Sequence, residues 1–166
     1  ALAHPDLASL LVRLADRTAA ARITLVHGDV SPKNILHGPK GPVLLDAECA
    51  WYGDPAFDLA FCSAHLLLKM VWKPPHAPAF LSAAAALRSA YFAGVDWEDP
   101  AGLDARAARL TAAVLLARVD GKSPADYLQA KEDRSFVREA ARRSLSGGGS
   151  TMANLTADWN EALSTR

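Results

Sequence analysis

The chain has little of several features that would assign it at once to a class of proteins. Its two cysteines, Cys49 and Cys62, are too few for a disulfide framework. Its 18 basic residues balance 18 acidic ones, so no overall electric field attracts nucleic acid or an anionic membrane. The apolar segment 59–71 is interrupted by His65 and Lys69 and is too short to span a bilayer. These absences exclude a disulfide-rich scaffold and argue against nucleic acid and membranes as partners.

What is present is the composition of an ordinary globular domain. The 166 residues are 51% hydrophobic and 22% charged, and a chain of this length buries a substantial core in one domain. Helical spacing of apolar residues predicts a series of helices. We expect them over Pro5–Ala21, Phe57–Trp72, Pro78–Ala93, Ala105–Val119, Pro124–Gln129, Glu132–Leu145 and Thr156–Leu163. The run Gly147–Gly149 is typical of a flexible connector.

Between the first two of these helices the sequence predicts short strands. Ile23–Val26 is β-branched and apolar, Ile35–His37 is a second short run, and Val43–Leu45 is a third. The segment 38–42, rich in Gly and Pro, predicts a turn between the last two strands. The predicted fold class is therefore α+β and mostly helical, with a small β element.

Three polar residues stand next to these strands, in an order that suits phosphoryl transfer. Asp29 follows the first strand, Asn34 precedes the second, and Asp46 follows the third. Phosphoryl transfer needs one carboxylate to orient the attacking hydroxyl, and oxygen ligands that hold Mg²⁺ against the phosphates. Asp29 suits the first task. Asn34 and Asp46 suit the second, because Mg²⁺ prefers hard oxygen ligands.

Three motifs in this region resemble those of the aminoglycoside phosphotransferase-like kinases. They are His27-Gly28-Asp29 followed by Asn34, Asp46 about a dozen residues later, and the block Gly53-Asp54-Pro55-Ala56-Phe57-Asp58-Leu59-Ala60. The superfamily includes choline, homoserine, fructosamine and methylthioribose kinases, and it is similar in fold to protein kinases. The resemblance implies a protein-kinase-like C-terminal lobe over residues 1–166, in which the small β element carries the catalytic loop.

The resemblance also assigns catalytic and metal-binding roles to single residues. Asp29 is the catalytic carboxylate that accepts the proton of the substrate hydroxyl. Asn34 and Asp46 are Mg²⁺ ligands. Glu48 matches the second acid of the Asp-x-Glu sequence of methylthioribose kinases, and is therefore a further candidate ligand.

Other residues of the motifs are expected to support the site. By resemblance, Asp58 bonds to the backbone of the catalytic loop and His27 packs under Asp46. Ser31 stands where protein kinases carry a Lys, a departure that favours a small-molecule acceptor. Lys33 is a minor candidate for binding phosphate.

By the same resemblance, the chain is a kinase that moves the γ-phosphate of ATP to a hydroxyl of an aminoglycoside, sugar or amino alcohol. ATP is the co-substrate, Mg²⁺ is the cofactor, and the few cysteines together with this chemistry indicate the cytoplasm. The Gly-rich loop and strand Lys of such a kinase are missing before Asp29, and Gly147–Gly149 comes too late in the chain. We therefore expect the N-terminal nucleotide lobe to be absent from this chain, and the chain alone to be inactive or nearly so. The surface that such a lobe covers could also drive dimerisation.

The sequence leaves the acceptor and its binding residues open. The candidates are Trp51, Tyr52, His65, Trp72 and the loop 120–123. Aromatic residues at helical spacing belong more often to a core than to a binding site. Specificity depends on the shape and polar contacts of a pocket, which fold-level analogy does not supply.

Two other functions compete with the kinase. A non-catalytic kinase-like module for binding or scaffolding would explain the missing nucleotide lobe. Hydrolysis that depends on Mg²⁺ would use the carboxylates of Asp29, Asp46 and Glu48, but it leaves Asn34 and the block 53–60 without a role.

Overall fold

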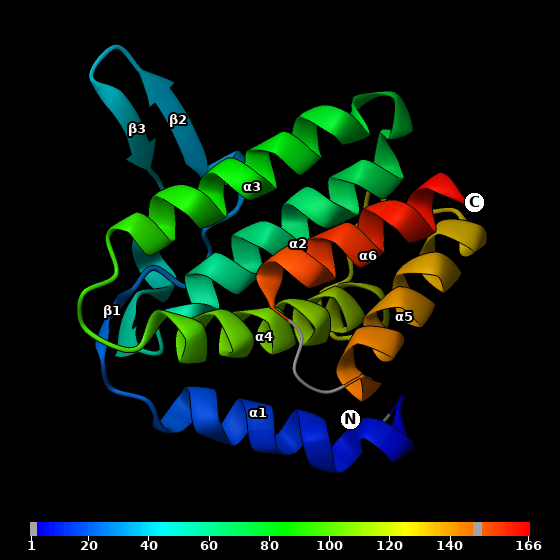
Figure 1. Cartoon of the computed structure of the whole chain (residues 1–166), viewed down its shortest axis with the longest axis horizontal. Helices are drawn as coiled ribbons and strands as arrows, with labels where there is room; N and C mark the ends of the chain where they lie inside the picture. Colours follow the sequence, from blue (N-terminus) through cyan, green and yellow to red (C-terminus); the bar gives the residue numbers. More distant parts are fainter. Residues whose placement is uncertain (1–2, 148–150) are drawn as a thin grey trace.

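The computed structural model describes residues 3–147 and 151–166, and most of these residues are helical (Figure 1). The helices are α1 (Ala8–Ala20), α2 (Ala56–Trp72), α3 (Ala77–Ala93), α4 (Pro100–Asp120), α5 (Lys131–Ser146) and α6 (Met152–Ser164). Short 3-10 turns, η1 (Pro5–Leu7), η2 (Pro32–Asn34), η3 (Ala47–Cys49) and η4 (Pro74–His76), occur between the larger elements. The connector expected at Gly147–Gly149 lies outside the described residues, apart from Gly147, which directly follows α5.

Helix α2 is the centre of the helical body. Its apolar residues occupy nearly every face, and Leu59, Leu67, Leu68 and Met70 are each at most 1% exposed. A helix that is hydrophobic all round is a core element, and α2 accordingly packs against both α3 and α4. Helix α4 packs in turn against α5, and α6 contacts α3 and α4. The first turn of α2, which carries Asp58, is therefore held in position by the packing of the helix.

Helix α4 begins at Pro100, earlier than the expected start at Ala105. The Asp99 carboxylate accepts a hydrogen bond from the N–H of Gly102 at 2.8 Å and so caps the helix. Proline suits the first helical position, where no backbone N–H is needed. The pair Asp99-Pro100 therefore marks the start of α4, whereas the spacing of apolar residues indicated only the part of the helix that follows.

The helix expected over Pro124–Gln129 is wrong, because this segment is irregular apart from a turn at residues 126–127. The N–H of Ala125 donates to the carbonyl of Arg118 at 2.7 Å, and the N–H of Leu128 donates to the carbonyl of Ala125 at 2.9 Å. Ala125 and Leu128 are each 3% exposed. Packing of these two side chains into the core has taken precedence over local helix propensity.

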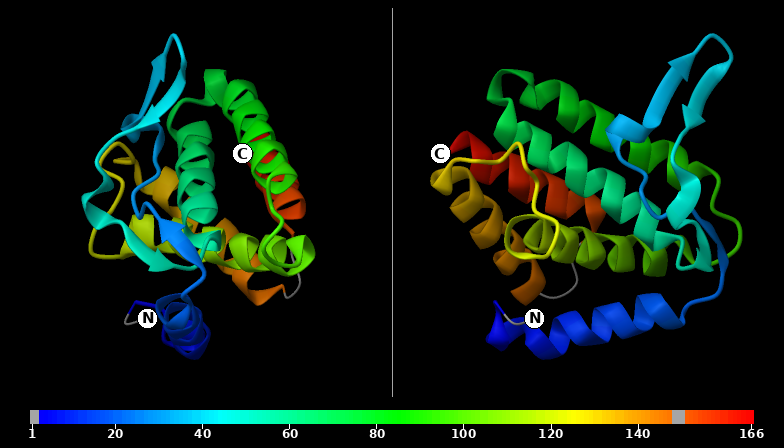
Figure 2. Two further views of the ribbon diagram at one scale, coloured as in Figure 1. Left: turned by 90° about the vertical axis from the view of Figure 1, so that its left-hand side faces the viewer. Right: turned by 180° about the vertical axis from the view of Figure 1, so that it is seen from behind.

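Two small antiparallel strand pairs make up the β element. β1 (Thr24–Val26) pairs with β4 (Trp51–Gly53), and β2 (Ile35–Gly38) pairs with β3 (Gly41–Leu44). The pair β2–β3 is a hairpin that projects from the helical body (Figures 1 and 2). The three expected strands are present with slightly shifted bounds, whereas β4 was not predicted. The loop between β1 and β2, which carries Asp29, is held where the two pairs meet the helices.

Helix α1 lies along the outside of the helical body (Figure 2). Its N-terminal end is attached through the His4 Nε2, which lies 2.9 Å from an Asp120 carboxylate oxygen, and through Asp6, whose Oδ2 accepts from Arg142 at 2.5 Å. Leu14 is the residue of α1 that is buried against the body. Within residues 3–147 and 151–166, no helix has the length and hydrophobicity needed to cross a membrane.

Candidate active site

A sharp turn after β1 starts the candidate catalytic loop. Gly28 has φ +87°, a conformation that side chains rarely adopt. A Cβ at Gly28 would lie 2.7 Å from the Cys49 carbonyl oxygen and 2.7 Å from the Trp51 ring. The backbone thus approaches η3 and β4 more closely than any residue other than glycine allows. This glycine lets the chain leave β1 and present Asp29 directly.

The carboxylate of Asp58, in the first turn of α2, accepts two backbone hydrogen bonds from this turn. The N–H of His27 donates to Oδ2 at 2.7 Å and the N–H of Gly28 donates to Oδ1 at 2.9 Å. Hydrogen bonds to an ionised group are stronger than neutral ones. The loop is therefore fastened to the central helix immediately before Asp29, in the arrangement that the resemblance implied for Asp58.

Asn34 holds Asp29 from the other side of the loop. Its Nδ2 donates to the Asp29 carboxylate oxygen Oδ2 at 2.8 Å and to the Asp29 carbonyl at 2.9 Å. Asn34 is 6% exposed, whereas the Asp29 side chain keeps 24% of its surface open. The exposed Nζ of Lys33 also lies 3.4 Å from Oδ2. Both side-chain contacts engage Oδ2, so Oδ1 of Asp29 is the oxygen that remains for a substrate.

The segment that carries Asp46 is joined to Asn34 by the backbone. The N–H of Leu45 donates to the carbonyl of Asn34 at 2.8 Å. Asp46 follows with φ 65° and ψ 50°, which makes it the one non-glycine residue of the described ranges with positive φ. Backbone strain of this kind is concentrated at functional sites. The next turn, η3, contains Glu48, and both acidic residues are exposed.

His27 makes a local contact with the backbone of Asp29. Its Nδ1 accepts a hydrogen bond from the N–H of Asp29 at 3.3 Å. Its Nε2 is buried and has no hydrogen-bond partner among the described residues. The packing of His27 under Asp46 stays a prediction.

A buried ion-pair network beside the loop was missed at the sequence level. Asp54 is 1% exposed, and both of its carboxylate oxygens accept from the Arg106 Nε at 3.0 Å. The Arg106 Nη2 donates to both oxygens of Glu98 at 2.9 Å. Asp54 also accepts from the N–H of Ala56, the first residue of α2. The network therefore connects the start of α2 to α4, and with it fixes the position of Asp58.

The residues considered for acceptor binding are scattered over different environments. The Trp51 ring packs edge-on against Phe57, with ring centroids 5.1 Å apart, beneath the loop. Tyr52 is 58% exposed on the open side of β4. Asp120 is engaged by His4 and by Arg138, which makes its role structural.

His65 and Trp72, by contrast, lie together on α2. The Nδ1 of His65 is 3.5 Å from the Tyr127 hydroxyl, and the Tyr127 ring packs at 5.0 Å from that of Trp72. Burial, as the larger cause, and the positive charge of Arg118 together lower the pKa of His65 to about 4. The carboxylate of Asp29 acts in the opposite direction on this pKa. His65 thus lies within electrostatic reach of the candidate catalytic loop.

Comparison with known proteins identifies the family. Residues 2–103 match the phosphotransferase enzyme family (APH), a region that includes α1, both strand pairs, α2, α3 and the start of α4. A search of curated proteins found no match. The match covers more than half of the chain and contains all three motifs noted above. The chain therefore belongs to the phosphotransferase enzyme family.

Proposed function

We propose that this chain is the C-terminal catalytic lobe of an enzyme that transfers the γ-phosphate of ATP to a hydroxyl of a small molecule. The observation that carries the proposal is the double hydrogen bond from Asn34 to Asp29, which fixes one carboxylate oxygen and leaves the other open. A general base must be held within hydrogen-bond reach of the proton that it accepts. Asp29 is the candidate for that base.

The chemistry assigned to Asp29 is simple. An acceptor hydroxyl donates a hydrogen bond to Oδ1 and is thereby aimed at the γ-phosphorus of ATP. As the hydroxyl oxygen bonds to phosphorus, the bond from phosphorus to the bridging oxygen of ADP breaks and the hydroxyl proton passes to Asp29. Most of the catalysis in such reactions comes from positioning and charge stabilisation rather than covalent chemistry.

The oxygen donors near Asp29 fit a magnesium ion. Asn34 uses Nδ2 for both hydrogen bonds to Asp29, so its amide oxygen is directed away from Asp29. With Asp46 and Glu48 it offers the hard oxygen ligands that Mg²⁺ prefers. No three His, Cys, Asp or Glu side chains of the described ranges form a metal-binding group by themselves. A ligand set at this position therefore includes the Asn34 amide and phosphate oxygens of the nucleotide.

When bound there, Mg²⁺ would neutralise charge on the phosphate oxygens. Asn34 would then have two roles, because its amide nitrogen holds Asp29 and its amide oxygen would be free to hold the metal. This dual use explains why an asparagine, rather than an aspartate, suits that position.

Exposed apolar side chains on each of the two strand pairs support a role for a second, nucleotide-binding lobe. Leu25, Leu36, Val43 and Tyr52 are between 52% and 74% exposed. Apolar groups gathered on a surface mark sites of association. We infer that an N-terminal lobe covers these side chains and supplies the remaining ATP contacts, while a second copy of the chain is the competing occupant.

The experiment that tests the function is a transfer assay with γ-labelled ATP and pooled hydroxyl compounds, using the entire polypeptide that the gene encodes. We expect labelled product, and a loss of about 10²-fold or more in Asp29→Asn, as for removal of a general base. Asp16→Asn, at an exposed position of α1, serves as the matched control. Equal rates in Asp29→Asn and Asp16→Asn would exclude the proposed role of Asp29.

A further inference from the structure

Cationic and aromatic side chains gather along the C-terminal half of α2. This cationic cluster consists of His65, Lys69, Trp72 and Lys73 on or next to α2, Arg118 on α4, and Tyr127 in the segment after α4. The turn η2 of the catalytic loop also packs on α2. In both views of Figure 2, the segment after α4 (yellow) and the loop after β1 (blue) lie on the same side of α2.

The ammonium groups of the cluster lie over aromatic rings. The Lys69 Nζ is 5.3 Å from the centroid of the Trp72 ring and 5.5 Å from that of Tyr127. The Lys73 Nζ is 4.4 Å from the Trp72 ring. Such contacts hold a cation in place without neutralising it. The ammonium groups of Lys69 and Lys73 are thus positioned by aromatic rings instead of by carboxylates.

Among the residues that the structure describes, none of these cations has an acidic partner. In the described ranges Lys69, Lys73 and Arg118 take part in no ion pair, whereas other arginines such as Arg106 and Arg138 are paired with carboxylates. The Arg118 Nε is buried and has no hydrogen-bond partner in the described part of the chain, and its Nη1 donates to the Ser123 hydroxyl at 3.3 Å. A buried donor on a cation is costly unless an acceptor is provided. The Arg118 guanidinium therefore lacks an acceptor, and an anionic group of a ligand could supply it.

The cluster and the catalytic loop are within electrostatic reach of each other at His65. The charges acting most strongly on His65 come from Arg118, Asp29, Lys69 and Lys33. Three of these are cations, and Asp29 is the proposed catalytic base. A molecule with its hydroxyl at Asp29 would therefore place its remaining groups in a positive environment.

We propose that the cationic cluster binds an anionic group of the acceptor, so that the acceptor is a hydroxyl compound carrying a carboxylate or phosphate. This inference rests on the proposed function, because it takes Asp29 as the point where the hydroxyl lies. Arg118 and Lys69 donate to the anionic group, and Trp72 and Tyr127 contact its carbon skeleton. A polycationic aminoglycoside is the opposite of what these charges attract.

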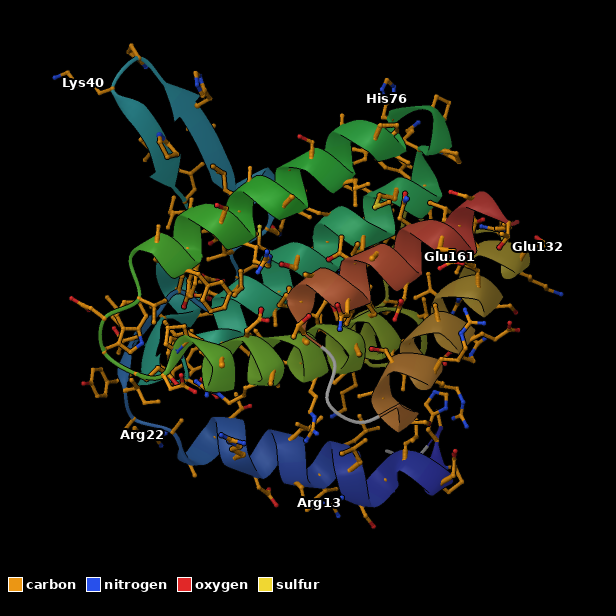
Figure 3. All side chains as sticks on the ribbon, viewed as in Figure 1. Arg13, Arg22, Lys40, His76, Glu132 and Glu161 are labelled. Atoms are coloured by element: carbon orange, nitrogen blue, oxygen red, sulfur yellow. The ribbon has the colours of Figure 1, made fainter. Side chains whose placement is uncertain are left out.

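The test is binding to the chain in the absence of nucleotide, followed by NMR of the Trp72 indole and His65 imidazole signals. The probes form three charge series: glycerate and gluconate, their neutral counterparts glycerol and sorbitol, and the cations choline and kanamycin. We expect at least one anionic probe to bind about tenfold or more tightly than its neutral counterpart, the effect of one charge-assisted hydrogen bond. We expect Arg118→Gln and Lys69→Gln to remove that preference. Lys40→Gln, at the exposed tip of the β2–β3 hairpin, should leave it unchanged (Figure 3).

Three results would overturn the inference. They are tighter binding of choline or kanamycin, no preference for an anionic probe over its neutral counterpart, and displacement of the anionic probe by MgATP. The last would assign the cations to the nucleotide. Because the binding test measures no phosphoryl transfer, its outcome does not depend on catalysis. If the transfer assay fails but the anionic probe still binds, the kinase function is rejected. If transfer occurs but no anionic probe is preferred, only the proposed acceptor class is rejected.

Discussion

The side-chain amide of Asn34 donates to both the carboxylate and the carbonyl of Asp29, at 2.8 and 2.9 Å. The two residues are the ends of one short loop, so the loop closes on itself at the point where chemistry is proposed. Such closure fixes the direction of the carboxylate before any substrate arrives. Preorganisation of this kind is the main contribution that a protein makes to phosphoryl transfer.

Removal of the Asp58 carboxylate should loosen the loop. Asp58→Ala leaves the N–H groups of His27 and Gly28 without their acceptor, and we expect it to lower the free energy of unfolding by about 2–3 kcal/mol. Urea titration followed by circular dichroism measures this change. Asp16→Ala provides the baseline for removing an exposed acid. A loss no larger than that of Asp16→Ala would mean that the two hydrogen bonds do not hold the loop.

Alanine substitutions at two glycines with positive φ allow the cost of backbone strain to be distinguished from the cost of steric overlap. Gly41 has φ +115° and open space around its Cα, whereas Gly28 has φ +87° and close neighbours. We expect Gly41→Ala to cost about 1 kcal/mol through backbone conformation alone. Gly28→Ala adds an overlap with the Cys49 carbonyl and should cost at least twice as much. Thermal unfolding of both variants tests the difference, and equal costs would show that the turn relaxes freely.

Breaking the buried Asp54–Arg106 pair should be among the most destabilising changes in the chain. Arg106→Met leaves a 1% exposed carboxylate without its cation, which costs about 3–5 kcal/mol. Arg109→Met, at an exposed position of the same helix, is the control. Chemical denaturation of both variants provides the comparison. A similar stability of the two would show that Asp54 finds another partner or water.

Stability should fall in mild acid because of His65. Its pKa is lowered by burial to about 4, from 6.5 in an unfolded chain. The folded state therefore favours the neutral ring, so this contribution is complete above pH 6.5 and is lost as the pH falls toward 4. At 1.4 kcal/mol per unit, the loss amounts to about 3 kcal/mol.

The measurement is the free energy of unfolding at pH 7 and pH 4.5. His65→Gln should show a clearly smaller drop than the unsubstituted chain. His76→Gln, an exposed histidine near the start of α3, should not differ from it (Figure 3). An unchanged drop in His65→Gln would assign the acid sensitivity to other groups.

The features that could be predicted from the sequence are local ones. The strand around Val26, the core helix α2 and the turn at Gly28 follow from short patterns of apolar residues and glycine. The family motif also places Asp29 and Asn34 only five positions apart in one loop. These elements depend on neighbours in the chain, so a sequence pattern is enough to indicate them.

The features that could not be predicted depend on contacts between distant segments. β4 is three residues long and exists because Trp51 pairs with Val26 across the sheet. The Asp54–Arg106 pair joins residues far apart in the chain, and no periodicity announces it. The segment 124–129 has a helical composition, but burial of its side chains against the body gave it another backbone. The cationic cluster likewise becomes visible only once Tyr127 is placed beside His65.

Calorimetric titration of the chain with ATP in the presence of Mg²⁺ tests the central claim most directly, with Asp46→Ala and Asp16→Ala compared. We expect weak but measurable binding, because the candidate metal ligands Asn34, Asp46 and Glu48 are on this chain, and we expect that heat to be lost in Asp46→Ala but not in Asp16→Ala. Removing one metal ligand typically costs at least about tenfold in affinity. Binding that survives in Asp46→Ala, or that is lost equally in both variants, would contradict the assignment of Asn34, Asp46 and Glu48 to a metal–phosphate site.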